Sequence, residues 1–140
     1  MPVPEASLAG IAAAAALEQV WPLPLPTNVR RVAGWPIVAA GAAVIAGSLK
    51  AAGSNELTNP DRLVTDGPYA WTRNPMYVGW GLLQLGIGVI AGSGWVLVSM
   101  PFVGAMVHRE VLREKRRLEE RFGDEYLEYS EKVGRWLPRR

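Results

Sequence analysis

The apolar residues of this chain are gathered into separate runs, and most polar residues lie between the runs or after the last one. Two runs, 34–49 and 76–94, are long enough with their flanks to cross a bilayer, which takes about 20 mostly apolar residues. A third run, 95–107, follows a Gly-Ser-Gly break and can continue as a helix into the polar residues beyond it. This pattern predicts an all-α integral membrane bundle.

The first apolar run, 7–21, is shorter than the others and contains Glu18 and Gln19. It has no basic segment before it, so it does not have the pattern of a signal peptide. A spanning or steeply inserted helix that ends at the first proline of the stretch WPLPLP is favoured instead. With this run included, the bundle is predicted to have about four transmembrane helices.

The charged residues are concentrated in the last quarter of the chain, where 108–140 holds ten basic and eight acidic residues. Its apolar positions recur at helical spacing, which predicts a charged helix ending at Gly123 and a short amphipathic helix capped by Asp124 and ended by Gly134. We predict one domain, 1–140, with transmembrane helices and loops in 7–107 and a cytoplasmic C-terminal cap in 108–140. The positive-inside rule places this cap in the cytoplasm, at the inner membrane if the chain is bacterial.

The composition removes several classes of chemistry. The chain has no cysteine and a single histidine, so neither a thiolate nucleophile nor a metal site is expected. Acids nearly cancel bases in the tail, which argues against nucleic acid as a partner and leaves membrane lipids as the expected contact. A basic helix lying on anionic lipid is the alternative interpretation of the tail, but mixed charges fit a folded cap better.

The stretch DGPYAWTRNPMYVGW places aromatic and polar residues at the edge of an apolar run, where polar groups are costly unless they bind something. Tyr69 and Tyr77 can stack on a ring or face a cation. Pro75 favours a helix start at Met76, whose free N–H groups can meet a carboxylate. Arg73 can bind a carboxylate or can stay structural by holding a carbonyl or Glu114.

Two motifs occur in order, LVTDGPYAWTRNPMYVGW and REKRRLEERFGDEYLEYSEKVGRWLP, separated by one apolar hairpin. Together they resemble the isoprenylcysteine carboxyl methyltransferase and phospholipid methyltransferase superfamily of integral membrane enzymes, over about 63–138. The resemblance implies an enzyme that transfers a methyl group from S-adenosylmethionine. The implied acceptor is a hydrophobic small molecule or a lipid-linked group, such as an isoprenylcysteine carboxylate or a lipid amine.

The resemblance also implies site residues. Arg73 and Glu114 are the candidate catalytic residues, and the candidate cofactor-binding residues are Leu63, Val64, Tyr69, Asn74, Pro75, Met76, Tyr77 and Glu114. The chain departs from the family pattern at Asn74, where many relatives have histidine, so a proton-shuttling role is not assigned there. It departs again at Glu110, where the prenylcysteine branch has an arginine.

Two other functions fit parts of the pattern. Membrane sterol reductases share a related helical plan and use NADPH, although this chain is short for that class. A non-enzymatic membrane scaffold or lipid-binding module would need none of the site residues. Binding of S-adenosylmethionine or NADPH, and its sensitivity to Glu114→Ala, distinguishes the three.

Overall fold

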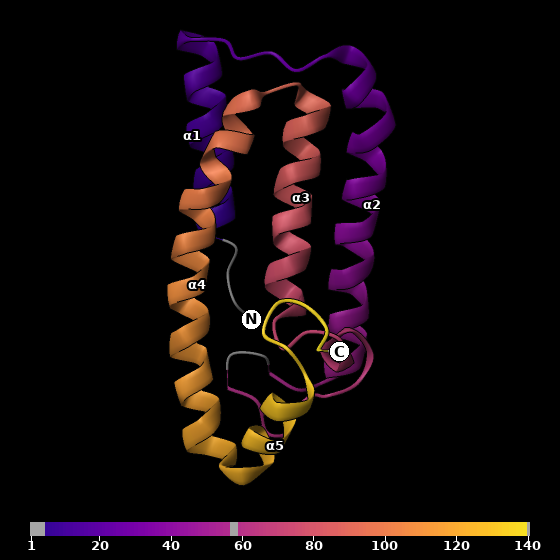
Figure 1. Ribbon diagram of the computed structural model, residues 1–140, viewed down its shortest axis with the longest axis vertical. Helices are drawn as coiled ribbons and strands as arrows, with labels where there is room; N and C mark the ends of the chain where they lie inside the picture. The colour runs from indigo at the N-terminus through magenta and orange to yellow at the C-terminus, as the bar shows by residue number, and fades with distance from the viewer. Residues whose placement is uncertain (1–4, 57–58, 140) are drawn as a thin grey trace.

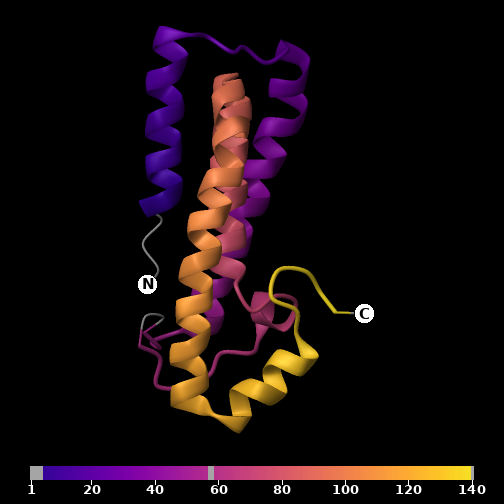
Figure 2. The same cartoon turned by 60° about the vertical axis from the view of Figure 1, so that its left-hand side comes forward.

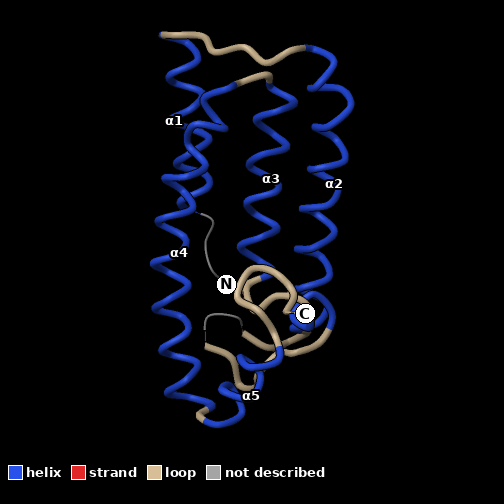
Figure 3. The backbone as a smooth tube through the Cα atoms, in the orientation of Figure 1, coloured by secondary structure: helices blue, strands red, loops and turns tan. Residues whose placement is uncertain are grey.

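In the computed structural model the chain is a bundle of helices with a small cap at one end (Figure 1). The structure describes residues 5–56 and 59–139, with the backbone only for Arg31. Its elements are α1 (Glu5–Val20), α2 (Thr27–Ala52), the 3-10 helix η1 (Gly67–Ala70), α3 (Pro75–Ala91), α4 (Gly94–Phe122) and α5 (Asp124–Lys132). Figure 3 shows no strand in the described ranges, which confirms the all-α prediction.

Helix α3 is the centre of the bundle, with α2 against one side of it and α4 with α1 against the other (Figures 1 and 2). The α2–α3 contact is close because small residues face each other. A Cβ added to Gly41 would lie 2.9 Å from the Gly79 carbonyl oxygen, and one added to Gly86 would lie 2.8 Å from the Val38 nitrogen. Backbones that approach this closely are typical of membrane helix pairs.

Two described helices, α2 and α4, are long and apolar enough to cross a membrane, and α3 is a shorter apolar helix of 17 residues. The predicted number of about four transmembrane helices therefore stays a prediction. Prolines do not interrupt the long helices, since α2 runs through Pro36 and α4 through Pro101. The predicted boundary at 107/108 falls inside α4, which joins the apolar and charged segments in one continuous helix.

The charged half of α4 extends past the other helices, and α5 folds back beneath the bundle (Figure 2). Tyr126, Tyr129 and Val133 form a small buried core there, covered by Leu63, Leu118 and Phe122. Gly123, with φ of +51°, ends α4 as predicted and also serves as the N-cap of α5. The predicted cap by Asp124 is wrong: the sharp reversal at Gly123 makes Asp124 the first helical residue, and no side chain caps α5.

At the opposite end, the proline-rich linker after α1 is fastened to the α3–α4 turn by polar contacts that we call the linker clasp. The Glu18 carboxylate accepts from the Leu23 N–H at 3.0 Å and from Ser93 Oγ at 2.8 Å. The Arg30 guanidinium donates to the Ile90 carbonyl from Nε at 3.1 Å and from Nη2 at 3.0 Å. These bonds fix the linker across the end of the bundle.

Candidate functional site

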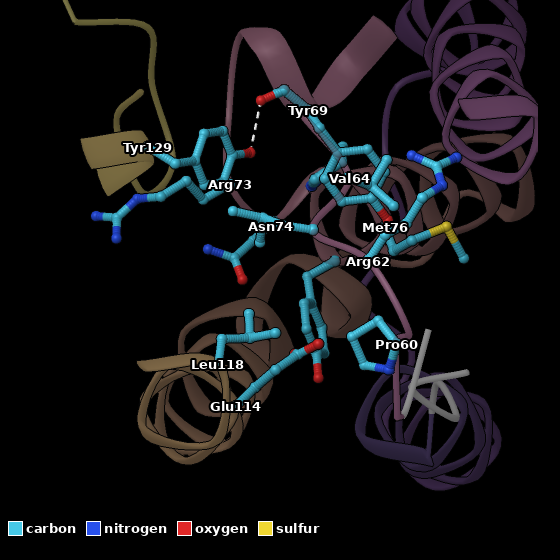
Figure 4. A pocket seen from close by; sticks show the side chains of 13 residues that line it. Pro60, Arg62, Val64, Tyr69, Arg73, Asn74, Met76, Glu114, Leu118 and Tyr129 are labelled. Carbon is cyan, nitrogen blue, oxygen red and sulfur yellow. Dashed lines mark hydrogen bonds between the residues drawn. The ribbon is translucent and has the colours of Figure 1, made fainter. Parts of the chain in front are cut away.

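A pocket of about 60 Å³ lies at the capped end of the bundle (Figure 4). The segment before η1, the start of α3, the charged half of α4 and α5 all contribute to its wall. Its lining residues are Pro60, Arg62, Leu63, Val64, Tyr69, Arg73, Asn74, Pro75, Met76, Tyr77, Glu114, Leu118 and Tyr129. The fold thus brings together all of the candidate site residues named from the sequence, although Glu114 is far from the others in the chain. Cofactor binding by these residues stays a prediction.

The start of α3 is held from outside the helix by the segment 133–135, which we call the C-terminal strap. Thr72 Oγ1 and Asn74 Nδ2 both donate to the Arg135 carbonyl, at 2.8 and 3.0 Å. The backbone N–H of Arg73 donates to the Gly134 carbonyl, also in the strap, at 3.0 Å. The amide nitrogen of Asn74 is therefore engaged with the strap, which leaves its Oδ1 as the group that can serve the pocket.

Two tyrosines close the pocket on the α5 side. The Tyr129 hydroxyl donates to the Tyr69 carbonyl at 2.6 Å (Figure 4). Burial raises the pKa of the Tyr69 phenol to about 12, and the charge of Glu114 adds to the increase. Burial also raises the pKa of the Tyr129 phenol well above its usual value, with Tyr69 and Tyr126 adding to the increase and Arg73 opposing it. Both phenols are therefore neutral near pH 7 and act as hydrogen-bonding groups.

Glu114 reaches the pocket from α4, and its carboxyl interacts with the Tyr77 hydroxyl from α3. Figure 4 shows the carboxylate directed inward between Leu118 and Pro60. The charges of Glu110 and Arg117 also act on Glu114. Glu110 itself pairs with Arg113 at 3.2 Å on the outer surface of α4. One carboxylate thus enters the pocket, while its neighbour one turn earlier is engaged outside it.

The Arg73 guanidinium points away from the pocket, although its side-chain stem lines the wall (Figure 4). Its Nη1 lies 3.2 Å from the Tyr126 hydroxyl, and its central carbon lies 5.9 Å from the centre of the Tyr126 ring. Its Nε is buried without a partner among the described residues. This geometry fits the structural alternative for Arg73, while its catalytic role stays a prediction.

Sequence reasoning did not assign four lining residues to the site, namely Pro60, Arg62, Leu118 and Tyr129. Tyr129 lies in the FGDEYLEY motif, so the motif itself contained a usable signal. For Arg62 the sequence contained no such signal. Its position at the site is set by two hydrogen bonds: its guanidinium donates to the Ala51 carbonyl at 3.0 Å, and its carbonyl accepts from Asn55 Nδ2 at 2.8 Å. These contacts fold the α2–η1 loop against the pocket.

A family model described as phospholipid methyltransferase matches residues 29–125. Protein-S-isoprenylcysteine O-methyltransferase from Homo sapiens is 37% identical over 89 residues, which cover 60% of this chain and 30% of that protein. The enzyme of the same name from Xenopus laevis is 36% identical over 85 residues, with the same two shares. The chain therefore spans about 30% of the length of these relatives.

Two further proteins are similar to this chain. An uncharacterized protein from Haemophilus influenzae is 34% identical over 61 residues, which cover 39% of this chain and 97% of that protein. A solved structure, of the eukaryotic intramembrane Ras methyltransferase ICMT without a monobody, matches with a TM-score of 0.60 at 23% sequence identity. It covers 99% of this chain and 53% of that one, so the two share a fold. The resemblance found in the two motifs is confirmed.

Proposed function

We propose, because this chain belongs to the phospholipid methyltransferase family, that it is a membrane enzyme that transfers a methyl group from S-adenosylmethionine to an apolar or lipid-linked acceptor. The observation that carries the proposal is the convergence of Tyr69, Tyr77 and Glu114 on one pocket. These residues come from η1, α3 and α4, so only the folded chain assembles them.

The residues of the pocket fit the chemistry of this cofactor. S-adenosylmethionine supplies a methyl group on a cationic sulfur, attached to a nucleoside and an amino acid. The Glu114 carboxylate can attract a cation or accept from hydroxyl groups, and the rings of Tyr69 and Tyr77 can stack or face positive charge. Val64 and Met76 are buried in the wall and supply apolar contact. These side chains together therefore suit a molecule with a cation, a flat ring and hydroxyl groups.

The contribution of the chain is to align the reactants and exclude water, because the leaving group of a sulfonium is already good. Tyr129 of α5 lines the pocket on the polar side, where it packs in one buried cluster with Tyr126 and Val133. Asn74 supplies no proton relay, since an amide does not titrate and its nitrogen is bonded to Arg135. An acceptor carboxylate needs no base, and an amine or thiol need only arrive deprotonated.

The acceptor is proposed to reach the pocket from lipid, along the apolar helices that end beside it. The candidates are an isoprenylcysteine-like carboxylate, a lipid amine or another small hydrophobic molecule. We also propose that the cap lies in the cytoplasm, because ten basic residues are concentrated in 108–140. The cofactor would then enter from the cytoplasmic side beneath the cap.

Binding calorimetry of the purified protein in detergent tests the proposal. S-adenosylhomocysteine should bind the wild-type chain and should bind Glu114→Gln at least roughly tenfold more weakly, because a charge-assisted contact is lost. Glu128→Gln is the matched control, since Glu128 is an exposed residue of α5 outside the pocket. A folded wild-type sample that binds NADPH but not S-adenosylhomocysteine would support a reductase instead. Methyl-labelled cofactor added to membranes containing the protein would then identify the acceptor.

A further inference from the structure

Two polar atoms are buried in α3 without a hydrogen-bond partner. Gln84 is 1% exposed, and its Oε1 accepts no hydrogen bond from the described residues. The indole Nε1 of Trp80 is also buried and finds no acceptor in the same parts of the chain. Both residues belong to an apolar helix, where an unpaired polar atom is destabilising and a buried amide is a candidate for a functional contact.

The Gln84 amide lies where α1, α3 and α4 meet. Its Nε2 donates to Ser99 Oγ of α4 at 3.2 Å. A Cβ added to Gly10 of α1 would lie 2.8 Å from the same nitrogen and 2.6 Å from Val103 of α4. Ser99 donates its own proton to the Val96 carbonyl at 2.7 Å, so it can only accept from Gln84, and this fixes which end of the amide faces it. The nitrogen end of the amide is therefore engaged, while the oxygen end is left without a donor.

The two unpaired groups are complementary in chemistry and close in the helix. Trp80 lies one turn before Gln84, so the two side chains leave the same face of α3. An indole N–H can only donate and an amide oxygen can only accept. A carboxylate could not donate to Gln84, and an ammonium could not accept from Trp80. A neutral hydroxyl group does both, since it has one proton and two lone pairs.

We propose that Trp80 and Gln84 together bind one hydroxyl group inside the apolar bundle, accepting from the indole and donating to the amide oxygen. Two sources offer this chemistry: an internal water molecule, and the hydroxyl of an apolar molecule dissolved in the membrane. Water is the source expected, because α1 and α4 enclose the Gln84 amide and buried waters typically bond to otherwise unpaired polar groups. Neither residue lines the pocket, so the inference goes beyond the proposed function and does not depend on it.

Magnetic resonance of the full chain in detergent, with isotope-labelled tryptophan, tests the site directly. Trp80→Phe identifies the indole signal of Trp80 by its loss. In the wild type this N–H should show a nuclear Overhauser contact with a long-lived water, which differs in sign from proton exchange. Gln84→Leu and Gln84→Met, which keep the size of the side chain but offer no acceptor, should abolish the contact. Ile87→Leu is the control, because Ile87 is an exposed apolar residue of the same helix and its replacement should leave the contact unchanged.

Addition of dodecanol or of dodecane separates the two sources. A water contact that persists with both additives and needs Gln84 assigns the site to water. If dodecanol, but not dodecane, replaces the water contact by one to its own protons, and only while Gln84 is present, the site stands and its source is a membrane-dissolved hydroxyl. A wild-type Trp80 N–H with neither contact would overturn the site. The same contact in a folded Gln84→Leu or Gln84→Met sample would overturn it as well, whatever calorimetry shows for S-adenosylhomocysteine.

Discussion

The two ends of the bundle use polar residues in different ways. In the linker clasp, both oxygens of Glu18 accept a hydrogen bond and the Arg30 guanidinium donates twice to one carbonyl. At the pocket end, the half-buried Glu114 lines the pocket with no ion-pair partner among the described residues. Partly buried polar groups are normally paired, so spare capacity that lines a cavity points to a ligand. The clasp is therefore interpreted as structural and the pocket as functional.

The largest effect is expected from Gly92→Val in the linker clasp. Gly92 has a φ of +75°, and a Cβ there would lie 2.7 Å from Arg30 Nε, which is fixed by its bond to Ile90. Backbone strain together with loss of the Arg30 contact should lower the free energy of unfolding by about 3 kcal/mol. Thermal unfolding in detergent measures this change, and affinity per folded molecule should not move.

Gly53→Val is the matched control for that prediction. Gly53 has a φ of +60°, but nothing lies within 4 Å of a Cβ built there. Gly53→Val should therefore lower the free energy of unfolding only by the backbone cost of a positive φ, about 1–2 kcal/mol. Equal losses in the two variants would contradict the view that the Arg30 contact stabilises the clasp.

The second effect separates the two glutamates. Glu114→Gln should weaken S-adenosylhomocysteine by about 2 kcal/mol, roughly 30-fold, with little change in thermal stability. Glu18→Gln should do the reverse, because it disturbs the bonds to Leu23 and Ser93 without touching the pocket. Calorimetry and thermal unfolding on both variants test the contrast. A loss of affinity in Glu18→Gln equal to that in Glu114→Gln would remove the distinction between the two ends.

A smaller effect is expected at Arg73, whose side chain lines the pocket while its guanidinium contacts Tyr126 of the cap. Arg73→Gln and Tyr126→Phe should each lower the free energy of unfolding by about 1 kcal/mol, because both remove the 3.2 Å contact. The double variant should cost less than the sum of the two, since the residues share one interaction. Turnover that collapses in Arg73→Gln but not in Tyr126→Phe would show a catalytic role that the contacts do not indicate.

The smallest effect is a pH dependence at the pocket end. The pKa of Tyr69 is raised from 10.0 to about 12, so the folded chain holds this proton more tightly than the unfolded chain does. The resulting stabilisation is fully present below pH 10 and is lost as the pH rises to about 12. Thermal unfolding between pH 8 and 12 should show a shallower decline in Tyr69→Phe than in the wild type. Superimposable pH profiles would contradict the assignment.

Much of the fold could be predicted from local patterns. The apolar runs indicated α2, α3 and the first half of α4, and Gly123 indicated the end of that helix. The cap at Asp124 was mispredicted because one glycine serves both helices, which local capping rules do not anticipate. The continuation of the third apolar run as a helix past 107/108 was predicted correctly, since a change from apolar to charged residues alters the environment of a helix without ending it.

The candidate site, like the fold, could be predicted only in part from the sequence. The two motifs named residues that the fold gathers around one pocket. The motifs could not show that the Asn74 amide nitrogen is used by the Arg135 carbonyl, or that the Arg73 guanidinium faces Tyr126. These pairings join residues more than fifty positions apart, and no short spacing rule contains them.

By itself, then, the sequence determined the helical segments, the separation of apolar and charged residues, and the family. Helical periodicity and motif spacing are local properties, so a linear pattern is enough to set them. Only the tertiary structure decided which polar groups are already paired and which remain available. That property depends on neighbours brought together across the chain, as when α4 places Glu114 beside residues from η1, α3 and the α2–η1 loop. The assignment of clasp and pocket rests on that difference.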